Sequence, residues 1–149
     1  MSGGTALAVV ITAVAGLAGS VQVALMSRFG ERIGVVEALA FSTLLTAVLS
    51  FGVLLAGRQS LAGYGDGLRA PLWLWAAGVM GLIVIFTITF ATPRIGATAT
   101  IGLLIAGQLA MGTVIDRFGL FGLERIPIDA TRMAGIALLA GGAALSLKK

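Results

Sequence analysis

Residues 95–122 constrain this chain most, because the segment begins with about twenty consecutive residues that carry no charge. A helix of that length crosses the hydrocarbon core of a bilayer. Four further apolar runs of comparable character complete the pattern. The sequence therefore predicts an all-α integral membrane bundle of five transmembrane helices, in a single domain over residues 1–149. The expected spans are residues 6–26, 35–56, 72–91, 95–115 and 131–147.

Composition supports this assignment. The chain is 58% hydrophobic and 11% charged, with a mean hydropathy of +1.08, whereas a soluble domain carries roughly 25% charged residues. The net charge of +4 lies in short gaps between apolar runs, so it reflects membrane topology and we expect no nucleic-acid partner. No Lys or Arg precedes the first run, which we therefore interpret as a retained membrane helix and not a signal peptide.

The chain contains no Cys and no His. This excludes disulfides, thiol or imidazole catalysis and most zinc sites. Only one carboxylate falls inside an apolar run, so the paired acid and base of an intramembrane enzyme are lacking. We therefore expect no catalytic residues, no metal and no cofactor.

Two of the predicted helices carry a ridge of small residues at four-residue spacing, which lets another backbone approach closely in lipid. The helix-packing candidates on these ridges are Gly16 and Ser20 in the first run, and Gly102 and Ala106 in the fourth.

Two amides lie within apolar runs. An amide in hydrocarbon is costly unless it finds a partner or a water-filled cavity. Gln108 therefore either joins two helices or lines a substrate route, and the residue alone leaves both interpretations open. It lies about 120° around the helix from Gly102, so one face serves packing while another presents the amide. Gln22, one turn from the end of the first run, is a candidate of the same kind.

Charged residues near the ends of the runs also have two interpretations. Glu37 lies about one turn into the second run, where it is either a first-turn acid favoured by the helix dipole or a protonatable coupling site. Asp116 and Arg117 follow the fourth run as either a gate or a plain interfacial anchor.

The connections are expected to be irregular. Residues 58–70 predict a polar loop without a catalytic pattern. Pro93 and Arg94 are expected to break the chain before the fourth helix. Asp129 is a suitable N-cap for the last helix.

Several segments, taken in order, resemble a known family. They are VQVAL followed by Arg28 and Gly30, then TPRIGA, AGQL, IDRFGLFG and RMAGIALLAGGAAL. They are similar to the YdcZ-like inner-membrane exporters, five-helix members of the drug/metabolite transporter superfamily that are related to half of an EamA-like ten-helix transporter. Two positions depart from that pattern: Met26 stands where an Asn is common, and Arg117 where a His is common. The mid-helix carboxylate of the first helix in small multidrug transporters has no counterpart here.

The resemblance implies a multi-pass protein of the bacterial inner membrane that exports small organic metabolites or drugs. Gln22, Glu37 and Gln108 are then substrate or coupling candidates, and Asp116 and Arg117 gate or interface candidates. The alternative is a non-transporting membrane subunit that scaffolds or regulates a larger complex. That alternative predicts that the three polar groups tolerate apolar substitution while the Gly ridges do not.

The basic residues are balanced across the predicted topology. With five spans, each side of the membrane receives five of the ten basic residues, and orientation follows an excess of Lys and Arg on the cytoplasmic side. We therefore expect the chain to insert in both orientations and to form an antiparallel homodimer. The alternatives are that it pairs with an inverted homologous chain, or that other features set a single orientation. One side receives Arg28, Arg32, Arg94, Lys148 and Lys149; the other receives Arg58, Arg69, Arg117, Arg125 and Arg132.

Overall fold

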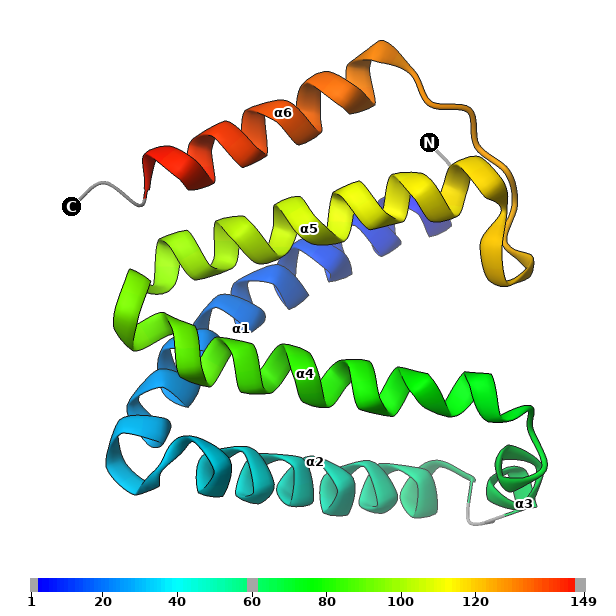
Figure 1. The fold of residues 1–149 in the computed structure, drawn as a ribbon. Coiled ribbons are helices and arrows are strands. Elements are labelled where there is room, and N and C mark those ends of the chain that lie inside the picture. Colours follow the sequence, from blue (N-terminus) through cyan, green and yellow to red (C-terminus); the bar gives the residue numbers. More distant parts are fainter. Residues whose placement is uncertain (1–2, 59–61, 147–149) are drawn as a thin grey trace. The chain divides into compact units, whose positions relative to one another are not determined.

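The computed structural model describes residues 3–58 and 62–146, and these residues are mostly helical, with no strand among them (Figure 1). The prediction of an all-α chain is confirmed. The elements are α1 (Gly3–Ile33), α2 (Val35–Arg58), α3 (Ala62–Leu68), α4 (Leu72–Ile95), α5 (Ala97–Phe118), the short 3-10 helix η1 (Leu120–Gly122) and α6 (Ala130–Leu145).

Among the described residues, four helices are long and apolar enough to cross a membrane, namely α1, α2, α4 and α5. The fifth predicted span corresponds to α6, which is apolar but has 16 residues. At ~1.5 Å per residue it is about 24 Å long, against a hydrocarbon core of about 30 Å. The tail residues Lys148 and Lys149, which enter the charge balance, lie outside the described residues.

The helices and connections differ from the prediction most clearly in three respects. α1 continues past residue 26 to Ile33. The expected loop at 58–70 contains the short helix α3. Pro93 does not end its helix but lies inside α4.

Glycines with positive φ provide the actual breaks. Gly34, between α1 and α2, has φ 105°, and Gly96, between α4 and α5, has φ 84°. Side-chain-bearing residues rarely adopt these values, so the helix direction changes at the glycine. The prediction that Pro93 and Arg94 break the chain was therefore wrong by two to three residues. Proline costs one backbone hydrogen bond, whereas the backbone at Gly96 is incompatible with any helix.

The chain divides into two compact units. The unit Leu25–Phe90 contains the end of α1, α2, α3 and most of α4. Its most buried residues are Ala38 and Thr89, each fully buried. Gly30 of α1 lies so close to Thr89 of α4 that a Cβ there would collide with the Thr89 methyl group. The rings of Phe29 and Phe41 make an edge-to-face contact, with centroids 5.4 Å apart.

The second unit comprises Met1–Ala24 and Ala91–Lys149. Here α6 runs antiparallel to α5 and packs along it (Figure 1). Ala99 of α5 and Ala143 of α6 are buried. Gly102 lies beside Ala143, because a Cβ at Gly102 would be 2.9 Å from the Ala143 Cβ. This α5–α6 pair forms the candidate functional site.

Candidate functional site

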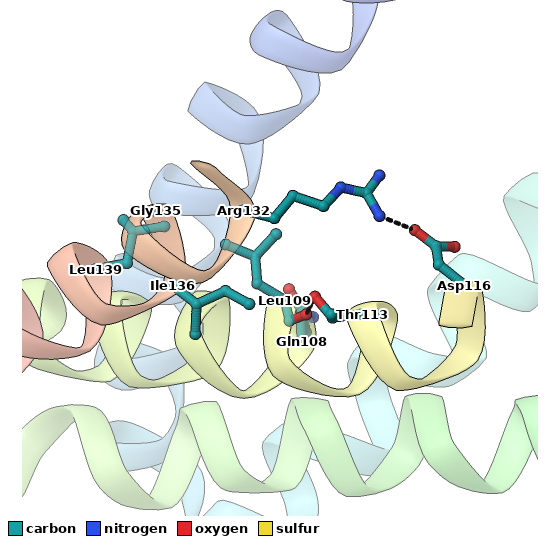
Figure 2. A pocket seen from close by; sticks show the side chains of 9 residues that line it. Gln108, Leu109, Thr113, Asp116, Arg132, Gly135, Ile136 and Leu139 are labelled. Carbon is teal, nitrogen blue, oxygen red and sulfur yellow. Dashed lines mark hydrogen bonds and ion pairs between the residues drawn. The ribbon is translucent and has the colours of Figure 1, made fainter. Parts of the chain in front are cut away.

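A pocket of about 310 Å³ lies between α5 and α6 (Figure 2). Its lining is mostly apolar, with polar groups from α5 and one arginine from α6. The lining residues are Gln108, Leu109, Gly112, Thr113, Asp116, Arg132, Gly135, Ile136 and Leu139.

The connection between the helices sets the position of α6. Gly119 ends α5 in the left-handed conformation, with its N–H bonded to the carbonyl of Ile115. The Ile126 N–H then donates to the Asp116 carbonyl over 2.9 Å, so the connecting segment folds back onto α5. Asp129 caps α6 by accepting a hydrogen bond from the Arg132 N–H at 2.7 Å. The predicted N-cap is confirmed.

An ion pair bounds one end of the pocket. The Arg132 Nη1 donates to the Asp116 Oδ2 over 2.7 Å (Figure 2). The side chains are 39% and 29% exposed, respectively, so the two charges are partly shielded from solvent. The pair neutralises the Asp116 carboxylate and joins the two helices.

Sequence reasoning missed Arg132 as a site residue. It entered only as one of the ten basic residues, although its position three after the cap Asp129 placed it in the first turn of α6. Its pairing with Asp116 spans 16 residues and depends on the path of the connecting segment. No periodicity in the sequence reports that path.

Gln108 lies on the α5 face that lines the pocket (Figure 2). Its side chain is exposed, and no hydrogen bond joins its amide to any described residue. Thr113, one turn further along, donates its hydroxyl to the Leu109 carbonyl at 2.8 Å. The Gln108 amide therefore retains donors and an acceptor for a ligand or a second chain.

The other polar candidates lie elsewhere. Gln22 is exposed on α1 and is not among the pocket residues. Glu37 lies in the first turn of α2, in the Leu25–Phe90 unit. Its carboxylate lies beside Gly34, since a Cβ at Gly34 would collide with it. Carboxylates are stabilised at this helix end by the positive end of the dipole.

Arg117 and the packing candidates have distinct surroundings. Arg117 points to a second hollow, which it shares with Arg125, so the structure joins Asp116 to Arg132 and not to Arg117. Gly102 contacts α6, whereas nothing lies within 4 Å of a Cβ built at Gly16. Ser20 donates its hydroxyl to the Gly16 carbonyl at 3.1 Å, and Ala106 is half-buried.

The α5–α6 pocket has the chemistry of a binding site. It offers an amide, a neutralised ion pair and an apolar wall, which together suit a small molecule with a polar end. Among the residues that the structure describes, no group of three or more Asp or Glu side chains gathers that could hold a metal ion.

Several apolar helices of membrane-spanning length, together with a pocket between one of them, α5, and the shorter apolar helix α6, define a multi-pass helical membrane protein. The chain belongs to the DMT_YdcZ family, described as "Putative inner membrane exporter, YdcZ", which it matches over residues 7–145. The resemblance found in the sequence is thereby confirmed.

A curated relative supports the same assignment. Inner membrane protein YdcZ of Escherichia coli (strain K12) is 29% identical over 139 residues, which covers 91% of each chain. No solved structure gives a significant match. The predicted location in the inner membrane, as a multi-pass protein, is confirmed. The family description is that of an exporter and not of an enzyme.

Proposed function

We propose that this chain is one half of an exporter of small organic molecules, which works by alternating access as an antiparallel homodimer. In transporters built from inverted repeats, the substrate site lies near the membrane midplane at the repeat interface. One copy of this chain supplies one repeat, and a second copy inserted the other way up supplies its inverted counterpart. The whole would then correspond to a ten-helix transporter of the drug/metabolite superfamily.

The observation that carries the proposal is the pocket between α5 and α6. Its volume of about 310 Å³ falls at the lower end of the range typical of small-ligand sites. Leu109, Ile136 and Leu139 supply an apolar wall, and Gln108 supplies an amide without a partner among the described residues. A polar group retained in this setting inside a membrane protein supports a transport route more than a purely structural role.

The exposed surface of α1 supports a partner chain. Gly16 and Ser20 lie on its small-residue ridge, and both are exposed. A ridge of this kind provides a close-packing surface for another helix in lipid. We assign this ridge to the contact with the second copy, while the ridge through Gly102 and Ala106 packs within the chain.

The polar groups then take different roles. Gln108 contacts the substrate, and Gln22 lines the route at a comparable depth in the inverted copy. The Asp116–Arg132 pair closes one end of the pocket, and Arg117 anchors the adjoining helix end at the membrane surface. The position of Glu37 beside Gly34 supports a helix-end role over proton coupling.

Flux measurements on the purified protein test the proposal. A thermal-shift screen of small organic molecules first finds a ligand, and proteoliposome flux then establishes transport. Gln108→Leu should retain expression and assembly but lose ligand binding and flux. The matched control is Thr46→Val, which removes a polar group from α2 whose hydroxyl bonds only to its own helix. A Gln108→Leu protein that still transports at the normal rate would favour the non-transporting subunit.

A further inference from the structure

A second hollow, at the end of α5 and separate from the transport pocket, contains two arginines. It has a volume of about 370 Å³ and is lined by Arg117, Phe118, Arg125, Ile126 and Pro127. None of these residues lines the pocket between α5 and α6. We propose that this hollow binds the phosphate of an anionic phospholipid headgroup.

The backbone brings the two arginines together. Arg117 lies in the last turn of α5, and Arg125 follows in the segment that folds back onto that helix. At Gly119 a Cβ would be 2.7 Å from the Arg125 Cγ and 3.0 Å from the Leu123 carbonyl oxygen. The absence of a side chain at Gly119 therefore lets the aliphatic stem of Arg125 lie against the end of α5.

Neither guanidinium is neutralised by the chain. Within residues 3–58 and 62–146, no ion pair or hydrogen bond involves the side chain of Arg117 or Arg125. Asp116 is paired with Arg132, Asp129 caps α6, and Glu124 is exposed and does not line the hollow. The Ile115 and Asp116 carbonyls are already satisfied by backbone N–H groups.

Two unpaired guanidiniums in one hollow repel each other, and an anion between them removes that repulsion. Phosphate oxygens match the guanidinium fork.

The location identifies the source of the phosphate as lipid. Arg117 and Phe118 end a helix of membrane-spanning length, which places them at the level of the headgroups. Two large apolar side chains that line the hollow are exposed, Phe118 at 61% and Ile126 at 42%. Exposed apolar side chains beside unpaired arginines match the boundary between acyl chains and anionic headgroups.

The proposal is tested by the binding of short-chain lipids to the full chain in detergent. The salt concentration is about 0.15 M, which limits non-specific attraction. Dioctanoyl phosphatidylglycerol should raise the Tm, whereas dioctanoyl phosphatidylcholine and inorganic phosphate at equal concentration should not. The double variant Arg117→Gln/Arg125→Gln should bind the phosphatidylglycerol about tenfold or more weakly, because charge-assisted hydrogen bonds are lost. The control Arg32→Gln/Arg69→Gln removes the same charge away from the hollow and should bind normally.

Each other result overturns the proposal. An equal Tm shift with inorganic phosphate would mean a free-anion site, and an equal shift with phosphatidylcholine would exclude recognition of negative charge. Equal losses in both double variants would indicate diffuse electrostatic attraction. If Arg117→Gln/Arg125→Gln does not fold, Arg117→Lys/Arg125→Lys retains both charges and should weaken binding roughly threefold, since Lys lacks the two-bond fork. Unchanged binding in that variant would likewise exclude the site.

Discussion

Arg132 donates a 2.7 Å hydrogen bond to Asp116 and thereby joins the first turn of α6 to the last turn of α5, although 16 residues separate the two. Both side chains are partly exposed, so the pair contributes modestly to stability. Its larger consequence is geometric, because it bounds the end of the pocket that contains Gln108 (Figure 2).

The first prediction concerns this ion pair. A double-mutant cycle with Asp116→Asn and Arg132→Gln should give a coupling energy of about 1 kcal/mol, the upper range for partly exposed pairs. Unfolding in detergent measures it. Arg28 and Glu31 provide the control, because their 3.2 Å pair on α1 is more exposed and should give only about 0.3 kcal/mol. Equal coupling energies for the two ion pairs would contradict the role of the Asp116–Arg132 pair in joining α5 to α6.

The second prediction concerns the contact between α5 and α6. Gly102→Ala places a Cβ 2.9 Å from that of Ala143, so α6 must shift, at a cost of about 1–2 kcal/mol. Gly102→Leu should further lower the yield of folded protein. Gly107→Ala is the matched control on the same helix, since nothing lies within 4 Å of a Cβ there, and it should be neutral or slightly stabilising. A stable Gly102→Ala protein would show that α6 does not pack here.

The third prediction concerns Gly16, where nothing lies within 4 Å of a built Cβ. Gly16→Leu should therefore fold but assemble poorly, because the bulky side chain keeps a second copy away. Cross-linking in membranes and native mass spectrometry report the dimer fraction. Ala18→Leu, about 200° around the same helix, is the control and should assemble normally. A normal dimer fraction in Gly16→Leu would remove the ridge from the interface.

The fourth prediction concerns Glu37. With its carboxylate beside Gly34 in the first turn of α2, Glu37→Gln should lower the free energy of unfolding by roughly 0.5 kcal/mol through loss of the dipole interaction. Proteoliposome flux should keep its dependence on the pH gradient. Loss of that dependence, with flux otherwise retained, would instead identify Glu37 as the coupling carboxylate.

The fifth prediction is dual topology. The ten basic residues divide equally between the two sides of a five-span chain. Two C-terminal reporter fusions should therefore both give a signal, one with a reporter active only in the cytoplasm and one with a reporter active only in the periplasm. Two Lys residues added to the tail should shift the population toward the form with its C-terminus inside. A signal from one reporter alone would mean a fixed orientation, and the second half would then have to be an inverted homologous chain.

The sequence by itself determined the class of the protein. Uncharged runs of about twenty residues have one stable environment, a bilayer crossed by helices, and that inference needed no knowledge of contacts. Local chemistry was equally informative at Asp129, whose side chain needs only the next turn of its own helix to act as a cap. Family membership could also be predicted from short sequence motifs, because they occur along this chain in the order typical of the family.

Only the tertiary structure decided which distant groups meet. The Asp116–Arg132 pair depends on a connection that folds back through the Ile126 N–H, and the arginine hollow depends on the close approach of Arg125 to Gly119. The tertiary structure likewise decided that the helix break between α4 and α5 lies at Gly96 and not at Pro93. Sequence periodicity reports which face of a helix is apolar or small, but the path of a connecting segment is set by the sum of its contacts. Those contacts exist only once the helices have packed.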